Sequence, residues 1–106
     1  MKELIESVKF LVNEEAERSM VNHPLFNSTH EGYAVIKEEV EEAAEELENV
    51  NFSLSSIWRN VKINDKENAI KHAGCLKDFA IKLAAESIQV SAMAQKFIDS
   101  CSKGEF

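Results

Sequence analysis

Apolar residues recur at intervals of three and four along most of the chain, which is the spacing of amphipathic α-helices. The first stripe predicts a helix over residues 2–21, and its apolar members are Leu4, Ile5, Val8, Leu11, Val12, Ala16 and Met20. This helix is expected to end at His23-Pro24, because the residue before a proline is disfavoured in the α region. A loop over residues 22–30 follows.

Two more helices are predicted after this loop. The second begins at a Ser28 or Thr29 cap and runs to about Asn49. The segment 51–53 is expected to break it, so that residues 53–62 form a short third helix. That short helix carries its own apolar positions, Leu54, Ile57, Trp58 and Val61.

The last helix is predicted to begin at a capping box, with Asn64 as the cap and Glu67 three residues later. It continues to Ser102, and Lys103-Gly104 forms a plausible stop. Between residues 79 and 97 apolar side chains point in nearly every direction, so this helix is expected to be central and buried.

Composition supports an all-α fold. The chain has 106 residues, the usual size of one domain, and its hydrophobic content of 44% is enough to bury a core. Only three Gly and one Pro are present, too few for the turns of a β-sandwich or β-barrel. We therefore expect a single domain over residues 1–106, a helical bundle of about four helices.

The remaining composition excludes several classes of protein. No apolar run has the length of a membrane span, and residues 1–6 interleave acids with apolar residues, unlike a signal peptide. Two cysteines do not make a disulfide framework; Cys75 and Cys101 are expected to pack as small apolar groups. A cytoplasmic protein without a membrane anchor is the resulting expectation.

The net charge of −7 comes from one segment. Eight acids and one base lie between Glu31 and Val50, whereas the acids and bases elsewhere cancel. An excess of acidic residues disfavours binding to the phosphate backbone of nucleic acids, so no nucleic acid is expected as a partner. The segment is either a solvated helix face or a site for something cationic.

The glutamates of this segment fall into two sets when they are placed at about 100° per residue. One set lies opposite the apolar stripe and is expected to be solvated: Glu38, Glu41, Glu45 and Glu48. The other set, Glu39, Glu42 and Glu46, forms a column at the edge of the stripe with no base among them. Stacked carboxylates repel, and a hard divalent cation such as Mg²⁺ or Mn²⁺ would relieve that repulsion.

Glu86 lies on an apolar side of the last helix, where a carboxylate without a partner is costly. One reading pairs it with Lys82, one turn earlier. The other has it face Glu39 and Glu42 across a helix pair, completing a site of oxygen ligands.

Two segments resemble a known family. Residues 36–42 fit the Glu-Glu-x-x-Glu motif of the all-α nucleoside triphosphate pyrophosphohydrolases, the MazG-like and dimeric dUTPase superfamily. Residues 86–89 stand where its second motif, Glu-x-x-Asp, is expected. Together with residues 30–39 and 86–94, they look like the short MazG-like proteins of bacteria and their phages.

The resemblance implies an oligomeric bundle that hydrolyses a nucleoside triphosphate to the monophosphate and pyrophosphate with bound Mg²⁺. Carried over by motif, Glu39, Glu42 and Glu86 would be metal ligands, and Glu38 a ligand or the base that orients water. Gln89 replaces the Asp of the second motif; its amide oxygen could still ligate Mg²⁺ but cannot act as a base.

Three further residues are candidates for binding the nucleotide. His30 could touch a phosphate or base, although a capping or packing role is the alternative. Trp58 is either core or a surface on which a nucleobase stacks, and Lys82 could contact phosphate.

Other functions remain open at this point. With Gln89 in the second motif, the chain could be a catalytically silent nucleotide-binding module. The acidic helix could also dock a basic partner or mimic a nucleic-acid backbone. In every case a homodimer or homotetramer is expected, because helices that are apolar over most of their circumference need covering.

Overall fold

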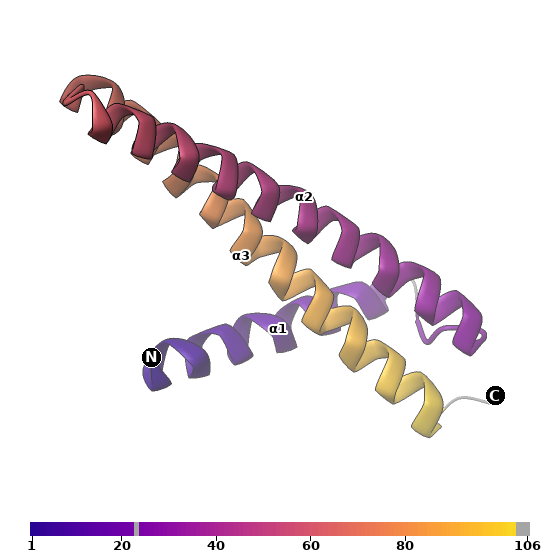
Figure 1. Ribbon diagram of the computed structural model, residues 1–106. Helices are drawn as coiled ribbons and strands as arrows, with labels where there is room; N and C mark the ends of the chain where they lie inside the picture. The colour runs from indigo at the N-terminus through magenta and orange to yellow at the C-terminus, as the bar shows by residue number, and fades with distance from the viewer. Residues whose placement is uncertain (23, 104–106) are drawn as a thin grey trace. The chain divides into compact units, whose positions relative to one another are not determined.

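The computed structural model describes residues 1–22 and 24–103, and all regular structure in that part of the chain is helical. Figure 1 shows three helices in chain order, α1 (Lys2–Asn22), α2 (Thr29–Lys62) and α3 (Lys66–Lys103). The all-α class is confirmed, with three helices in place of about four. The predicted boundary signals at His23 and Gly104 lie outside the described residues.

α2 is one continuous helix of 34 residues, so the break predicted at residues 51–53 is wrong. Asn, Phe and Ser are only slightly poorer helix formers than Ala, and no Gly or Pro interrupts this segment. The Ser56 hydroxyl donates to the Phe52 carbonyl at 3.2 Å, which leaves the helical backbone intact.

The ends of α2 follow ordinary capping chemistry. At the start, the Ser28 hydroxyl accepts from the Glu31 backbone N–H at 3.1 Å, which identifies Ser28 as the cap. At the end, Asn64 has a left-handed backbone with φ of 58°. The Asn64 N–H donates to the Val61 carbonyl and the Asp65 N–H to the Asn60 carbonyl, the paired bonds of a Schellman motif.

Asn64 therefore ends α2 and does not begin α3, so the predicted capping box with Glu67 is wrong. Asp65 is the cap of α3 instead, since its carboxylate accepts the Asn68 N–H at 3.1 Å. The same carboxylate accepts from the Asn68 amide at 2.6 Å.

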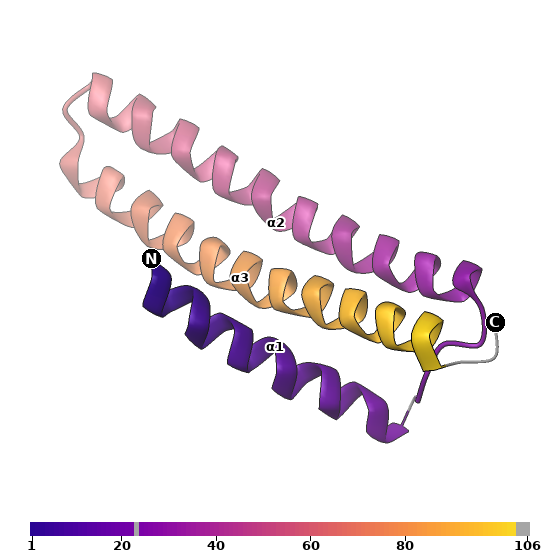
Figure 2. The ribbon, with the colours of Figure 1, turned by 90° about the horizontal axis from the view of Figure 1, so that it is seen from below.

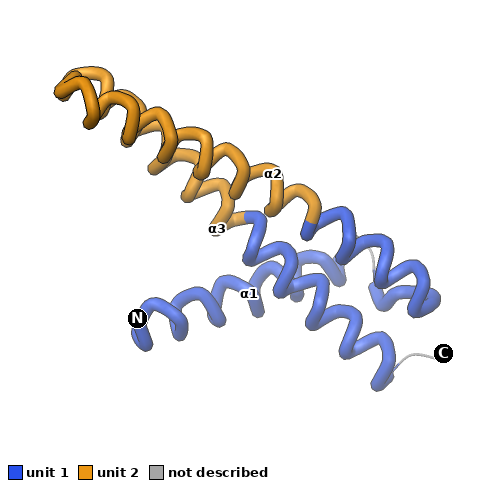
Figure 3. Tube along the Cα trace, viewed as in Figure 1, with its two compact units in different colours: residues 1–40, 86–106 blue, residues 41–85 orange. Residues whose placement is uncertain are grey.

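The chain divides into two compact units, shown in different colours in Figure 3. The first unit contains Met1–Val40 and Glu86–Phe106, and the second contains Glu41–Ala85. The prediction of one domain over residues 1–106 stays a prediction.

The core of the first unit is small. Its buried apolar side chains are Phe26, Ala92 and Met93. Figure 1 and Figure 2 together show that α1 crosses the C-terminal part of α3 at an angle. The Phe26 N–H donates to the buried Ser100 hydroxyl at 2.9 Å, which fixes the loop before α2 on α3. Gly32 is buried on α2, and a Cβ there would lie 2.5 Å from the Phe97 ring, so this close approach requires glycine.

In the second unit the residues classed as buried are two serines, Ser53 and Ser56. Large apolar side chains there remain exposed, with Phe52 at 70%, Trp58 at 58% and Ile70 at 64%. Of the two interpretations of Trp58, the one that places it in the core is therefore wrong. α3 is likewise not covered on all sides, because Ile81 and Ile98 are more than half exposed.

Two further expectations concern the cysteines and the length of the apolar segments. Cys75 and Cys101 are free and exposed, so the prediction that their thiols are packed is wrong. None of the helices in residues 1–22 and 24–103 combines the length and the apolar character that a membrane crossing needs.

Candidate functional site

Three carboxylates converge from α2 and α3. One oxygen from each of Glu39, Glu42 and Glu86 lies within 4.8 Å of the others. Glu39 and Glu86 both belong to the first unit and are half-buried. Glu42 follows Glu39 by three residues on the same helix, which places the two side chains on one face.

This cluster agrees with the sequence-based grouping of the glutamates. The set predicted to be solvated is exposed throughout: Glu38, Glu41, Glu45 and Glu48. Glu38, the candidate base, is thus adjacent in sequence to a cluster residue but points into solvent. The alternative pairing of Glu86 with Lys82 stays a prediction, because the two residues belong to different units.

A group of three carboxylates suits a hard cation. Like charges at this separation repel, and the repulsion grows as the side chains leave water. Carboxylate oxygens are the ligands that Mg²⁺ and Mn²⁺ prefer, and such ions usually keep several waters beside one or two protein carboxylates. The donor set of Glu39, Glu42 and Glu86 therefore fits a divalent cation.

Glu46, the last member of the predicted column, is half-buried in the second unit. Its Oε2 atom is shut off from solvent and has no hydrogen-bond partner within the described part of the chain. A buried carboxylate oxygen without a donor is costly, because it has given up its hydrogen bonds to water and gained none in return.

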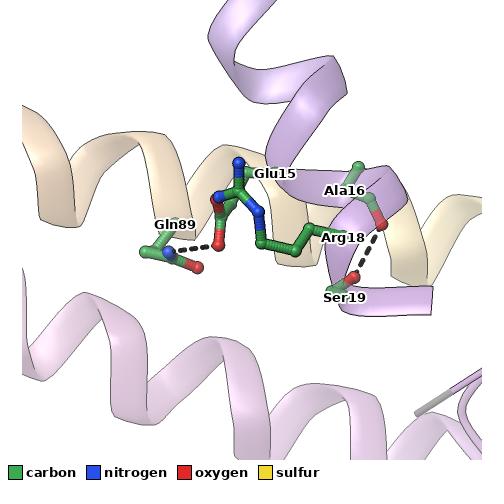
Figure 4. A network of polar contacts seen from close by, with 5 residues as sticks. All are labelled: Glu15, Ala16, Arg18, Ser19 and Gln89. Carbon is green, nitrogen blue, oxygen red and sulfur yellow. Dashed lines mark hydrogen bonds and ion pairs between the residues drawn. The ribbon is translucent and has the colours of Figure 1, made fainter. Parts of the chain in front are cut away.

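Gln89 is engaged with α1, as Figure 4 shows. Its amide nitrogen donates to Glu15 Oε1 at 2.7 Å. The other oxygen of Glu15 pairs with Arg18, and Ser19, one residue on, donates to the Ala16 carbonyl at 2.8 Å. Sequence reasoning did not find this partner, because Glu15 lies 74 residues away and has no distinguishing pattern on its helix.

The candidate nucleotide-binding residues lie in different places. His30 is exposed and lines a shallow pocket with Thr29, Tyr33 and Phe97 in the first unit. Trp58 belongs to the second unit, where the Lys62 ammonium lies 5.7 Å from the centroid of its indole. Lys82, in the same unit, is 5.7 Å from the Phe79 ring centroid.

Sequence reasoning missed Lys96, which is only 4% exposed. Its ammonium lies 5.0 Å from the Phe26 ring centroid and donates to the Ser19 carbonyl at 3.5 Å. Burial lowers the pKa of Lys96, and the negative charge of Glu31 opposes that shift. No local signal distinguishes this lysine in the sequence, because its cover comes from α1 and the loop.

Lys96 lines a pocket of about 600 Å³ in the first unit. Phe26, Val35 and Met93 supply apolar walls, and Glu31 and Gln89 supply polar groups. Gln89 follows Glu86 by three residues on α3, so the pocket begins one turn from a carboxylate of the cluster.

Comparison with known proteins finds no relative of this chain. No family model, no curated protein and no solved structure matches the chain.

Proposed function

We propose that this chain is a Mg²⁺-dependent nucleoside triphosphate pyrophosphohydrolase. The observation that carries the proposal is the convergence of Glu39, Glu42 and Glu86, which brings acids from two helices within 4.8 Å of one another. The Glu-Glu-x-x-Glu resemblance of residues 38–42 supports the same assignment.

The residues would divide the chemistry among them. Glu39, Glu42 and Glu86 would hold Mg²⁺ or Mn²⁺, which when bound neutralises phosphate charge and polarises the scissile anhydride. Glu38 is not one of the three cluster residues, and its role as the base that would accept a proton from the water adding to the α-phosphorus comes from the resemblance alone. The bond from that phosphorus to the bridging oxygen breaks, and the products are a nucleoside monophosphate and pyrophosphate.

A panel of ribo- and deoxyribonucleoside triphosphates with Mg²⁺ tests this proposal through release of pyrophosphate. Glu39→Gln and Glu86→Gln should each reduce turnover at least about a hundredfold, because a neutral amide binds a hard cation more weakly. Glu48→Gln is the matched control, an exposed glutamate on the same helix that should leave turnover unchanged. Turnover that persists in both cluster variants would point to a contaminating enzyme and overturn the proposal.

Metal binding can be measured without turnover. Calorimetric titration with Mn²⁺ or Mg²⁺ should show a site in the wild type that is lost in Glu39→Gln and in Glu86→Gln. A wild-type protein that binds neither cation in the presence of nucleotide would contradict the assignment of the cluster.

A catalytically silent nucleotide-binding module is the second candidate, and the Gln89–Glu15 contact favours it. Gln89 occupies the position of a motif carboxylate, and its amide is held by α1. This candidate predicts nucleotide binding without release of pyrophosphate under any metal condition. Turnover by the wild type would exclude it.

The proposal includes a homodimer or homotetramer. It is supported by the small set of buried apolar residues, Phe26, Ala92 and Met93, beside many large apolar side chains that stay exposed. Exposed apolar area on this scale is typical of surfaces that associate.

A further inference from the structure

The pocket beside Lys96 in the first unit has the chemistry of a separate binding site. We propose that it binds a small carboxylic acid with an apolar body, whose carboxylate accepts a hydrogen bond from the Lys96 ammonium. The described residues that line this pocket include none of Glu39, Glu42 and Glu86. The inference is therefore independent of the metal site and of hydrolysis.

Four segments of the first unit enclose the pocket. Ser19 comes from α1, Phe26 from the loop before α2, Val35 from α2, and Met93 and Lys96 from α3. The volume of about 600 Å³ lies within the range of about 300–1,000 Å³ that small-molecule sites usually have. The pocket is therefore large enough for an aromatic ring that carries a carboxylate.

Apolar side chains form much of the wall. Phe26 and Met93 are buried members of the core, and Val35 is half-buried and packs against them. An apolar ligand body gains free energy when it leaves water for such a surface. The thioether of a methionine also makes favourable contacts with aromatic rings. These walls favour a ligand with a hydrocarbon or aromatic body.

Lys96 brings a positive charge to this apolar site. The side chain is almost fully buried, and its ammonium lies 5.0 Å from the centroid of the Phe26 ring. An ammonium that has left water is costly unless a negative charge lies close to it. Burial lowers the pKa of Lys96, and the negative charge of Glu31 opposes that shift without cancelling it. An anion inside the pocket would therefore be stabilised by Lys96.

Glu31 also lines the pocket, but it differs from Lys96 in its surroundings. Its side chain is exposed, so water screens its charge. Asn27 holds it in place, since the Asn27 backbone N–H donates to one carboxylate oxygen at 3.4 Å and the Asn27 amide donates to the other at 3.3 Å. Glu31 therefore repels a bound carboxylate only weakly, whereas Lys96 attracts it in apolar surroundings.

The composition of the pocket favours a carboxylate over a phosphate. A carboxylate carries one negative charge, which one ammonium balances through a charge-assisted hydrogen bond. A phosphate group carries up to two negative charges on three oxygens. Part of that charge would lose its water against Phe26, Val35 and Met93, which offer no donor.

Benzoate, added without metal or nucleotide, is the probe for this site. NMR of the methionine methyl groups locates it, because Met93 lines this pocket and Met1 lines a different one at the start of α1. Benzoate should shift the Met93 signal with a dissociation constant of about 1 mM or tighter. The Met1 signal should stay in place.

Benzamide is the matched control ligand, because it has the shape of benzoate and no charge. It should bind at least about tenfold more weakly, since the charge-assisted hydrogen bond to Lys96 is lost. Lys96→Met should weaken the binding of benzoate by a similar factor and leave that of benzamide unchanged. Lys103→Met, at an exposed lysine of the same helix, should alter neither.

Val35→Phe fills part of the pocket without changing its charge, so it should weaken the binding of both ligands. This variant and the comparison of the two ligands on the wild type keep the test decisive if circular dichroism shows that Lys96→Met is unfolded. Inorganic phosphate should leave the Met93 signal unchanged.

Four results would overturn the inference. The first is a Met93 signal that does not move at about 10 mM benzoate, ten times the expected dissociation constant. The others are equal affinities for benzoate and benzamide, tighter binding of phosphate than of benzoate, and unchanged benzoate binding by folded Lys96→Met. Glu39→Gln should bind benzoate as the wild type does, so failure here is distinguishable from failure of the proposed function.

Discussion

The Gln89 amide donates to the Glu15 carboxylate at 2.7 Å, and this contact joins α3 to α1. The Glu15 side chain is 19% exposed, and its second oxygen pairs with Arg18. A carboxylate at position 89 would meet another carboxylate there, whereas the amide supplies the donor that Glu15 accepts. Gln89, which stands where the Glu-x-x-Asp motif has Asp, thus supplies the hydrogen-bond donor for this contact with α1.

Gln89→Asp should destabilise the protein by about 1–3 kcal/mol at neutral pH, because a hydrogen bond is replaced by repulsion between two carboxylates. Urea unfolding monitored by circular dichroism measures the loss. Adding Glu15→Gln to this variant restores an amide–carboxylate pair and should recover most of the lost stability. Equal stability of Gln89→Asp and wild type would show that Glu15 does not depend on the amide.

The two helical glycines should respond to alanine in opposite directions. At Gly32 a Cβ would lie 2.5 Å from the Phe97 ring and 3.0 Å from Phe26, so Gly32→Ala should cost about 1–3 kcal/mol. At Gly74 nothing lies within 4 Å of a Cβ, so Gly74→Ala should stabilise α3 by about 1 kcal/mol. Thermal unfolding of both variants measures the two signs, and a shift in the same direction would contradict this account.

Lys96 should make stability depend on pH in the alkaline range. Burial lowers the pKa of its ammonium below 10.5, so the folded chain releases the proton at lower pH than the unfolded chain does. Between the lowered pKa and 10.5 the unfolded chain binds more protons, and the free energy of unfolding rises with pH across that window.

Lys96→Met removes this linkage. The free energy of unfolding of the wild type should therefore increase relative to that of the variant as pH rises toward 10.5. Urea unfolding at neutral and alkaline pH measures the difference. Lys77→Met, a variant at an exposed lysine of the same helix, should show no such change. A constant difference between wild type and Lys96→Met would rule out the burial effect.

The cap of α3 should titrate in acid. Hydrogen bonds from Asn68 lower the pKa of Asp65 below 3.8, so its stabilising effect is present above 3.8 and is lost as pH falls through the lowered pKa. Asp65→Ala should lower the thermal midpoint at neutral pH, whereas Asp65→Asn should retain the cap. If Asp65→Asn and wild type lose stability equally on acidification, another carboxylate is responsible.

Local pattern was enough to predict the helical class and the body of each helix. The spacing from Leu4 to Met20 predicted α1 correctly, since apolar periodicity is a property of the segment itself. Boundaries that depend on a competition between weak preferences were less predictable. Residues 51–53 continue α2 and Asn64 ends it, because the outcomes differ by small backbone energies.

The candidate site, too, was predictable only where its geometry lies within one helix. Grouping the glutamates by face correctly separated exposed Glu38 from Glu39 and Glu42, because that geometry lies within one helix. The approach of Glu86 depended on pairing two distant segments, and the resemblance supported it. The partner of Gln89 and the burial of Lys96 come from α1, whose docking leaves no mark in the local sequence.

The contacts of α1 have a consequence for how the chain folds. The turn between α2 and α3 closes a short loop, with His72 bonded to Asn60 only twelve residues away. α1 is held by Glu15 and Ser19 to partners 74 and 77 residues distant. Closing a long loop costs more entropy and takes longer than closing a hairpin, so α1 should dock last and its amides should exchange first in the native protein.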